Sequence, residues 1–376
     1  MNTLDLSILS TLPLFPTEIL AEILQSPTLY RFDLARCCRV NSTFLALAQP
    51  LLYHTLTLDL YTRDLETEND GWTVELFDGS SPQLFRTLRE NPSIARLPRS
   101  LWICAEIETE RQVEEDLVFD YREDAIQYFL ELMPRVESLK INGMMWRSRE
   151  VQEVVFSNCE KWTEFDLFED LLEEEVGGDL SKWINLQKLR CYGIEFSKPP
   201  GGVLPDNLEN LDLYFRSQEN CLEPANFSPN SQLRILRISS SDLTLSVISI
   251  LPRLEQLHFY AAPGYPRTLS SSTLSSFAKL PRLRLLSFRF NFATNSNTSP
   301  LELLSYLPPT LDRLEFPEYI PFQPLLAFLN DPNPSSIRTI GIARRTTSIS
   351  EIAIEMKELF SACRTKNIQI DYISPD

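Results

Sequence analysis

The chain has 376 residues, 43% of them apolar, and a formal net charge of −17. This length and composition suffice for one large core or for two domains. A charge this negative argues against general affinity for nucleic acid, and no apolar run approaches the length of a membrane span. We therefore expect a chain that binds neither nucleic acid nor membrane.

The cysteines and the N-terminus bear on the compartment. Seven cysteines are scattered through the chain without a C-x-x-C pair, which indicates free thiols in a reducing environment. The first residues lack a basic stretch and include Asp5, so a secretory signal is not expected. A cytoplasmic location, a nuclear location or both are the expectation.

A short amphipathic helix is expected near the N-terminus, beginning at Pro16, where a missing N–H costs nothing. Its apolar stripe at helical spacing consists of Ile19, Leu20, Ile23 and Leu24. Pro27 ends the helix, because the residue before a proline disfavours helical backbone. A helix this short is not stable alone in water, so its stripe needs a cover.

Two more short helices follow in the prediction. Asp33 is expected to cap one, Ser42 the next, and Pro50 to end it before a strand over residues 51–58. Three short helices in this space rarely build a self-sufficient core. Either they cap a larger domain, or the uncovered stripe is a docking site for another protein.

The same residues resemble an F-box. Three pieces carry the resemblance, in order: Phe15-Pro-Thr-Glu-Ile-Leu20, Leu34-Ala-Arg-Cys-Cys-Arg-Val-Asn-Ser-Thr-Phe44 and Leu51-Leu-Tyr53. The family usually has Leu where Phe15 stands and often Trp where Phe44 stands. The resemblance implies docking to the Skp adaptor, and through it to the cullin, of a ubiquitin ligase. By the same resemblance, the adaptor-binding residues are Phe15, Pro16, Ile19, Leu20, Ile23, Val40 and Phe44.

From Tyr53 onward one pattern recurs, apolar-x-x-apolar-x-apolar, as in Leu208-Glu-Asn-Leu-Asp-Leu213. From Leu139 the copies follow one another at steps of 21 to 29 residues, up to a last copy that places Ile368 at the second apolar position. This signature is typical of leucine-rich repeats. The last two apolar positions of each copy share one face of a short strand, and stacked neighbours join them into a continuous core.

The expected fold is therefore a mixed α/β solenoid, a leucine-rich-repeat-like array of parallel strands and helices, with an N-terminal three-helix F-box. The expected domains are an F-box-like module at residues 1–58 and the solenoid at 59–376, with acidic insertion loops near 62–72 and 105–121. Helical return segments are expected at 122–132, 149–156, 243–250, 274–280, 301–307, 325–329 and 350–363.

The strand register predicts a buried core and an outward face. The core residues are Leu139, Ile141, Leu189, Leu211, Leu213, Leu236, Ile238, Leu257, Phe259, Leu286, Phe288, Leu314 and Phe316. One outward column holds Lys140, Asp166, Arg190, Asp212, Arg237, His258, Ser287 and Glu315. The column beside it holds Asn142, Phe168, Tyr192, Tyr214, Ser239, Tyr260 and Arg289.

Tyrosine and arginine dominate protein-binding hot spots, so the outward columns suggest where a target protein binds. The hypothetical target-binding patch consists of Arg190, Tyr192, Tyr214, Arg237, His258, Tyr260 and Arg289. The alternative is that these side chains pad neighbouring strands or lie under loops.

Residues for catalysis are scarce. The chain has two histidines, His54 and His258, and no zinc, calcium, phosphate-loop or dinucleotide spacing. We expect no metal, no cofactor and no enzymatic activity. The leading hypothesis is the substrate-recognition subunit of an SCF-type ubiquitin ligase. The alternatives are a leucine-rich scaffold whose N-terminal helices only cap the solenoid, and an acid–base enzyme centred on His258.

Overall fold

The computed structural model describes most of the chain. The described residues are 16–63, 73–76, 81–107, 124–142, 149–168, 175–176, 180–192, 195–196, 203–214, 224–239, 251–260, 277–289, 304–317, 322–331, 336–343 and 349–373. They form two compact units, residues 1–139 and 140–376. The boundary expected at residue 58 separates sequence modules rather than compact units and stays a prediction.

Three helices open the first unit: α1 (Thr17–Leu24), α2 (Arg31–Cys37) and α3 (Ser42–Tyr53). They enclose a small core of Leu24, Leu34 and Ala48, against which partly buried side chains of α2 and α3 pack. The expectation of three short helices is confirmed. Their core is small, so these helices depend on contacts beyond their own propensity.

Three details of these helices differ from the prediction. Asp33 lies inside α2, where its Oδ2 accepts a hydrogen bond from the backbone N–H of Tyr30 at 3.1 Å. Asn41 caps α3 by accepting from the N–H of Phe44 at 2.9 Å, in place of Ser42. Pro50 lies within α3. Residues 51 and 52 pack against the helical core, and this packing offsets the hydrogen bond that proline removes.

The rest of the first unit contains the strands β2, β1 and β3, in that order in the sheet, and the unit ends within β4. Leu56 and Leu58 of β1 pair in parallel with Leu101 and Ile103 of β3, and all four side chains are buried. β1 continues through residue 63 and β3 through 107, so both strands extend beyond the expected loop starts; residues 64–72 and 108–121 lie outside the described part. The bounds are β1 (Thr55–Arg63), β2 (Thr73–Leu76), α4 (Ser81–Glu90), α5 (Pro92–Ala95), β3 (Ser100–Ile107), α6 (Asp124–Leu132) and β4 (Ser138–Asn142).

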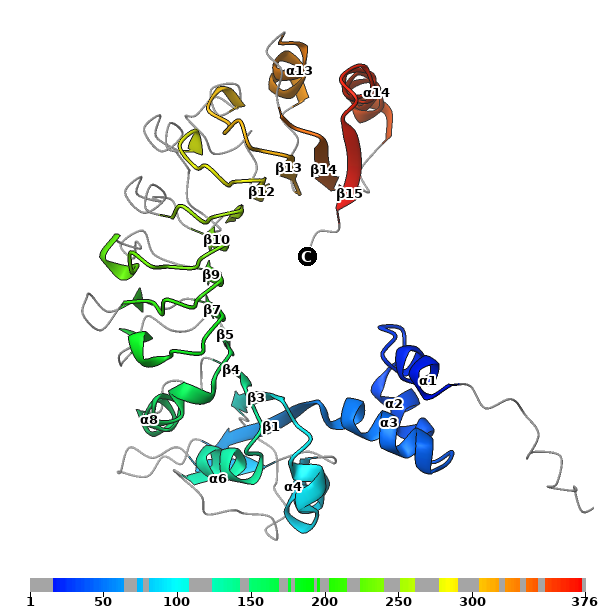
Figure 1. Cartoon of the computed structure of the whole chain (residues 1–376), viewed down its shortest axis with the longest axis vertical. Helices are drawn as coiled ribbons and strands as arrows, with labels where there is room; N and C mark the ends of the chain where they lie inside the picture. The colour runs from blue at the N-terminus through cyan, green and yellow to red at the C-terminus, as the bar shows by residue number, and fades with distance from the viewer. Residues whose placement is uncertain are drawn as a thin grey trace, which may run out of the picture. The chain divides into compact units, whose positions relative to one another are not determined.

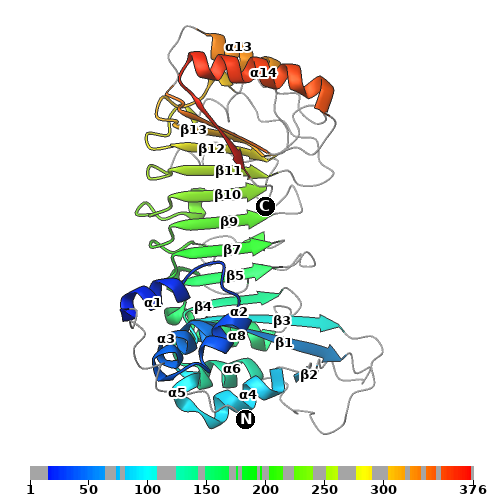
Figure 2. The same cartoon turned by 90° about the vertical axis from the view of Figure 1, so that its right-hand side faces the viewer.

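The second unit is a row of parallel strands in chain order, from β4 to β15. In Figures 1 and 2 these strands lie side by side in a curved row, with the helices α8, α13 and α14 on its outer side. The strands are β5 (Glu164–Phe168), β7 (Lys188–Tyr192), β9 (Asn210–Tyr214), β10 (Ile235–Ser239), β11 (Gln256–Tyr260), β12 (Leu285–Arg289), β13 (Arg313–Phe316), β14 (Thr339–Ala343) and β15 (Gln369–Ile373). β6 (Glu175–Val176) and β8 (Glu195–Phe196) pair separately.

The core of this unit follows the predicted register. Leu189 pairs with Leu211, which pairs with Leu236, and the same row continues to Ile340. All thirteen predicted core residues are at most 2% exposed. Among them, Phe259, Phe288 and Phe316 stack in sequence, with 5.9 and 6.2 Å between neighbouring ring centroids. The chain is therefore a solenoid of leucine-rich-repeat type in this unit, because one continuous core joins strands that are too short to stand alone.

The last repeat differs from the prediction by two residues. Ile370, and not Ile368, pairs with Ile340. A shift of two keeps the same face of the strand toward the core, so the sequence pattern alone could not distinguish the two registers.

The expected helices are found where the structure describes them. They are α8 (Arg149–Ser157), α13 (Phe322–Asn330) and α14 (Ile349–Thr365), with short 3-10 turns at Cys159–Lys161, Leu180–Lys182 and Pro224–Asn226. The expected helix at 243–250 and the first three residues of those at 274–280 and 301–307 lie outside the described residues; in the described remainder only residues 277, 304 and 305 are helical. Among the described helices, none has the length and apolar character to cross a membrane.

Candidate functional site

Figure 1 shows helices on the outer side of the curved row of strands. The core residues lie between the strands and these helices, so the alternate positions of each strand, which form the predicted outward columns, face the inner side. The strand register confirms the first of these columns, the one predicted to run from Lys140 to Glu315. In it Asp166 pairs with Arg190, Arg190 with Asp212 and Asp212 with Arg237. The column continues through His258 and Ser287 to Glu315. Side chains from strands about 20 to 30 residues apart in the chain therefore meet along one line.

The first half of this column is a ladder of alternating charges. Lys140 Nζ lies 3.4 Å from Asp166 Oδ2, and Arg190 Nη1 lies 3.3 Å from the same oxygen. Arg190 Nε donates to Asp212 Oδ2 at 3.1 Å, and Arg237 Nη1 donates to both Asp212 oxygens at 3.0 and 3.1 Å. Burial alone would lower the pKa of Arg190, but the carboxylates of Asp166 and Asp212 raise it above its ordinary value.

The second half of the column is buried rather than exposed. His258 is 7% exposed and Ser287 is fully buried, although both lie on the outward side of their strands. Burial, followed by the positive charges of Arg237 and Arg289, lowers the pKa of His258 to about 3. His258 is therefore neutral at physiological pH, which corrects its prediction as an exposed surface residue.

The neighbouring column is partly aromatic, as predicted. Tyr192 pairs in register with Tyr214, and Tyr260 with Arg289, whose guanidinium carbon lies 5.1 Å from the Tyr260 ring centroid. Tyr192, Tyr260 and Arg289 are half-buried, and the side chain of Tyr214 lies outside the described part. A cation over an aromatic ring stabilises both side chains, so Tyr260 and Arg289 act as one unit.

The seven predicted target-binding residues thus lie in two adjacent columns, but they differ in access. Arg190 and Arg237 keep 29% and 27% of their side chains exposed. Asp212 is only 1% exposed, and it was predicted in the column but not as a site residue. Ser287 was missed in the same way. The charge at this strand position alternates in sign from one repeat to the next, and this alternation is the sequence signal that could have identified the ladder.

The predicted adaptor-binding residues lie on the three-helix module. Pro16 is exposed, Ile19 is 41% exposed, Ile23 51% and Val40 62%. Leu20 is half-buried, Phe44 is half-buried against the helical core, and Phe15 lies outside the described residues. Three further exposed apolar residues were not predicted: Tyr30, Phe32 and Leu45.

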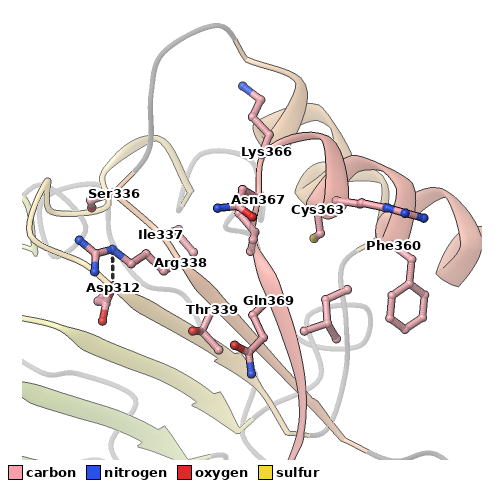
Figure 3. Close-up of a pocket in the computed structure, with 13 residues that line it drawn as sticks. Asp312, Ser336, Ile337, Arg338, Thr339, Phe360, Cys363, Lys366, Asn367 and Gln369 are labelled. Atoms are coloured by element: carbon pink, nitrogen blue, oxygen red, sulfur yellow. Dashed lines mark ion pairs between the residues drawn. The ribbon is translucent and has the colours of Figure 1, made fainter.

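A separate hollow of about 1120 Å³ lies beside α14 and the starts of β14 and β15 (Figure 3). Its lining mixes cations with apolar side chains, and at one side of it Arg338 Nε lies 3.5 Å from Asp312 Oδ1. Burial raises the pKa of Cys363 to about 11, so this thiol is not a nucleophile at neutral pH. Within the described part of the chain no cluster of His, Cys, Asp or Glu could hold a metal ion.

Comparisons with known proteins add little beyond the fold. No protein-family model and no curated protein matches the chain. Among solved structures, the leucine-rich repeat-containing protein LegL7 from Legionella pneumophila is 17% identical, covering 64% of this chain and 84% of that one, with a TM-score of 0.41. An internalin, inlF, from Listeria monocytogenes is 13% identical over 65% and 83%, with a TM-score of 0.26. At such scores, the strand pairing of the chain itself carries the fold assignment.

Proposed function

We propose that the chain is the substrate-recognition subunit of an SCF-type ubiquitin ligase. Its helical module would dock a Skp-type adaptor, and through it a cullin, while the inner face of the solenoid holds a target protein. Ubiquitin transfer would take place on the partner subunits, so the chain itself needs no catalytic group, metal or cofactor. This function implies a cytoplasmic or nuclear location.

One observation carries the proposal. Ile19 and Ile23, one helical turn apart on α1, turn their side chains to solvent, although the module has a core in which large apolar residues could be buried. Removing such side chains from water stabilises an interface by about 25 cal/mol for each Å² of apolar surface buried. Exposed Ile19, Ile23 and Val40 match the resemblance to an F-box better than a module that only caps the solenoid, whose apolar stripe would be covered.

The solenoid supports the second half of the proposal. Repeat arrays present long inner surfaces that bind other proteins. Half-buried Arg190, Tyr192, Arg237 and Tyr260 give this surface both charge and aromatic area. The enzyme alternative has less support, because the described surroundings of His258 are two arginines and a serine, with no nucleophile–base pair.

Co-purification with a Skp-type adaptor tests the docking function. In full-length chain, the double variant Ile19→Lys/Ile23→Lys should lose the adaptor, because each substitution places a charge in an apolar interface. Ile184→Lys is the matched control: it alters an isoleucine that is 55% exposed in the second unit and should leave adaptor binding intact. Both variants should melt as the wild type does.

Retention of the adaptor by the double variant would contradict the docking function. Unfolding of the double variant alone would favour the alternative, a leucine-rich scaffold whose N-terminal helices cap the solenoid. In that case Ile19 and Ile23 would be part of a covered core, and the function would reduce to protein binding by the repeats.

A further inference from the structure

The charge ladder on the inner face ends on a cation, Arg237, with no acidic residue at the next position of the column. From Lys140 to Arg237 the column alternates strictly in sign, and each carboxylate lies between two cations. The next position, one strand further, is the neutral His258. Among the residues that the structure describes, Arg237 therefore has a carboxylate on one side only, that of Asp212.

The groups that follow Arg237 have unused hydrogen-bonding capacity. Among the described residues, the ring nitrogens of His258 and the hydroxyl of Ser287 are buried and have no hydrogen-bond partner. Within the described part of the chain, the hydrogen bonds of Arg237 use only its Nη1. Unsatisfied buried polar groups cost about 1–3 kcal/mol each, so two such groups on adjacent strands form a candidate site for a ligand that would pair with them.

We propose that Arg237, His258 and Ser287 form an anchoring site for one anionic oxygen group, a carboxylate or a phosphate, carried by the target protein. This inference rests on the proposed target-binding role of the inner face and names the chemistry that the face recognises. The anion would take the place that an acidic residue would fill in the ladder. It would accept hydrogen bonds from Nη2 or Nε of Arg237, the N–H of His258 and the hydroxyl of Ser287.

The surrounding charges favour an anion at this point. Arg237 and Arg289 are the charges that act on His258, and Arg289 stands over Tyr260 at the rim. Glu315 follows Ser287 in the column. Its negative charge is neutralised by Arg313, whose Nε lies 2.6 Å from Glu315 Oε1. The side chains of Arg237 and Arg289, whose charges act on His258, are partly exposed, and their rotation would open the ring to a partner.

The two histidines of the chain give a selective assay. In full-length protein labelled at the histidine rings, NMR resolves His258, assigned by its loss in His258→Gln, and His54 as an internal control. Titration with inorganic phosphate and, separately, with acetate should give a saturable shift of the His258 signal. Arg237→Gln should weaken that response about tenfold or more, whereas Arg234→Gln, on an exposed arginine paired with Glu255, should not.

A response to phosphate alone would identify a phosphorylated target, and a response to acetate a target with an acidic side chain or chain end. Equal shifts at His258 and His54, no shift with either anion, or an unchanged response in Arg237→Gln would overturn the inference. The anion titration uses the protein without adaptor or target, so a negative result there speaks only against the anion site. Failure of the proposed function would instead appear as absence of adaptor binding together with a normal anion response.

Discussion

Removal of the Asp212 carboxylate should destabilise the second unit strongly. Asp212 is 1% exposed and accepts three hydrogen bonds from two guanidinium groups. Asp212→Ala would leave Arg190 with Asp166 and Arg237 with no described carboxylate. Breaking a buried ion pair from one side costs about 3–5 kcal/mol. Because both arginines retain more than a quarter of their exposure, we expect a loss of about 3 kcal/mol.

Urea denaturation followed by tryptophan fluorescence measures this loss, since Trp162 and Trp183 are fully buried in the same unit. Asp312→Ala is the matched control. Asp312 also faces an arginine, Arg338, but the two side chains are 51% and 84% exposed, and exposed pairs contribute about 0–1 kcal/mol. Equal small losses for the two variants would refute the conclusion that the ladder stabilises the sheet.

Three further predictions concern the core, the buried histidine and the aromatic column. Leu236→Ala should lower the free energy of unfolding by about 2–5 kcal/mol, because the side chain is fully buried in mid-array. The unfolded chain binds a proton near pH 6.5 but folded His258 only near 3. Stability is therefore lost as pH falls below 6.5, by about 2 kcal/mol at pH 5 relative to His258→Gln. Alanine at Tyr192, Tyr214 and Tyr260 together should abolish target capture in a proximity-labelling assay and preserve adaptor binding.

Each of these has a control in the same chain. Leu45→Ala, on a side chain 40% exposed, should cost under about 1 kcal/mol. Tyr372→Ala removes a tyrosine that is 59% exposed on β15 and should preserve target capture. A wild type and a His258→Gln variant with parallel stability curves between pH 5 and 7 would show that His258 is not buried neutral. Undiminished capture by the triple variant would move the target site away from this column.

The repeat architecture could be predicted because its pattern is local. In each copy of the pattern, the apolar residues at positions four and six belong to the core. Leu211 and Leu213 could therefore be assigned to the core from six residues alone. Where two registers keep the same face inward, as at Ile368 and Ile370, the pattern gives no preference. Local propensity predicts that Pro50 ends its helix, whereas the packing of residues 51 and 52 against the helical core carries the helix past it.

The site could be predicted only in part. The columns followed from the strand register, so Arg190 and Tyr192 were placed on the correct face. The burial of His258 depends on side chains from neighbouring strands, such as Arg237 and Arg289, and on no feature of its own repeat. The apolar stripe of α1 could be predicted from helical spacing, but the burial of Leu24 and the exposure of Ile19, Ile23 and Tyr30 could not, since they depend on how the helices pack.

Hydrogen–deuterium exchange of the full-length chain, with and without a Skp-type adaptor, tests the central claim most directly. The account predicts that the adaptor slows exchange in residues 17–24 of α1 and around Val40, while exchange in β7 through β12 stays unchanged, since the inner face is reserved for the target. Protection confined to the strands, or no protection at α1 with adaptor in excess, would contradict the account.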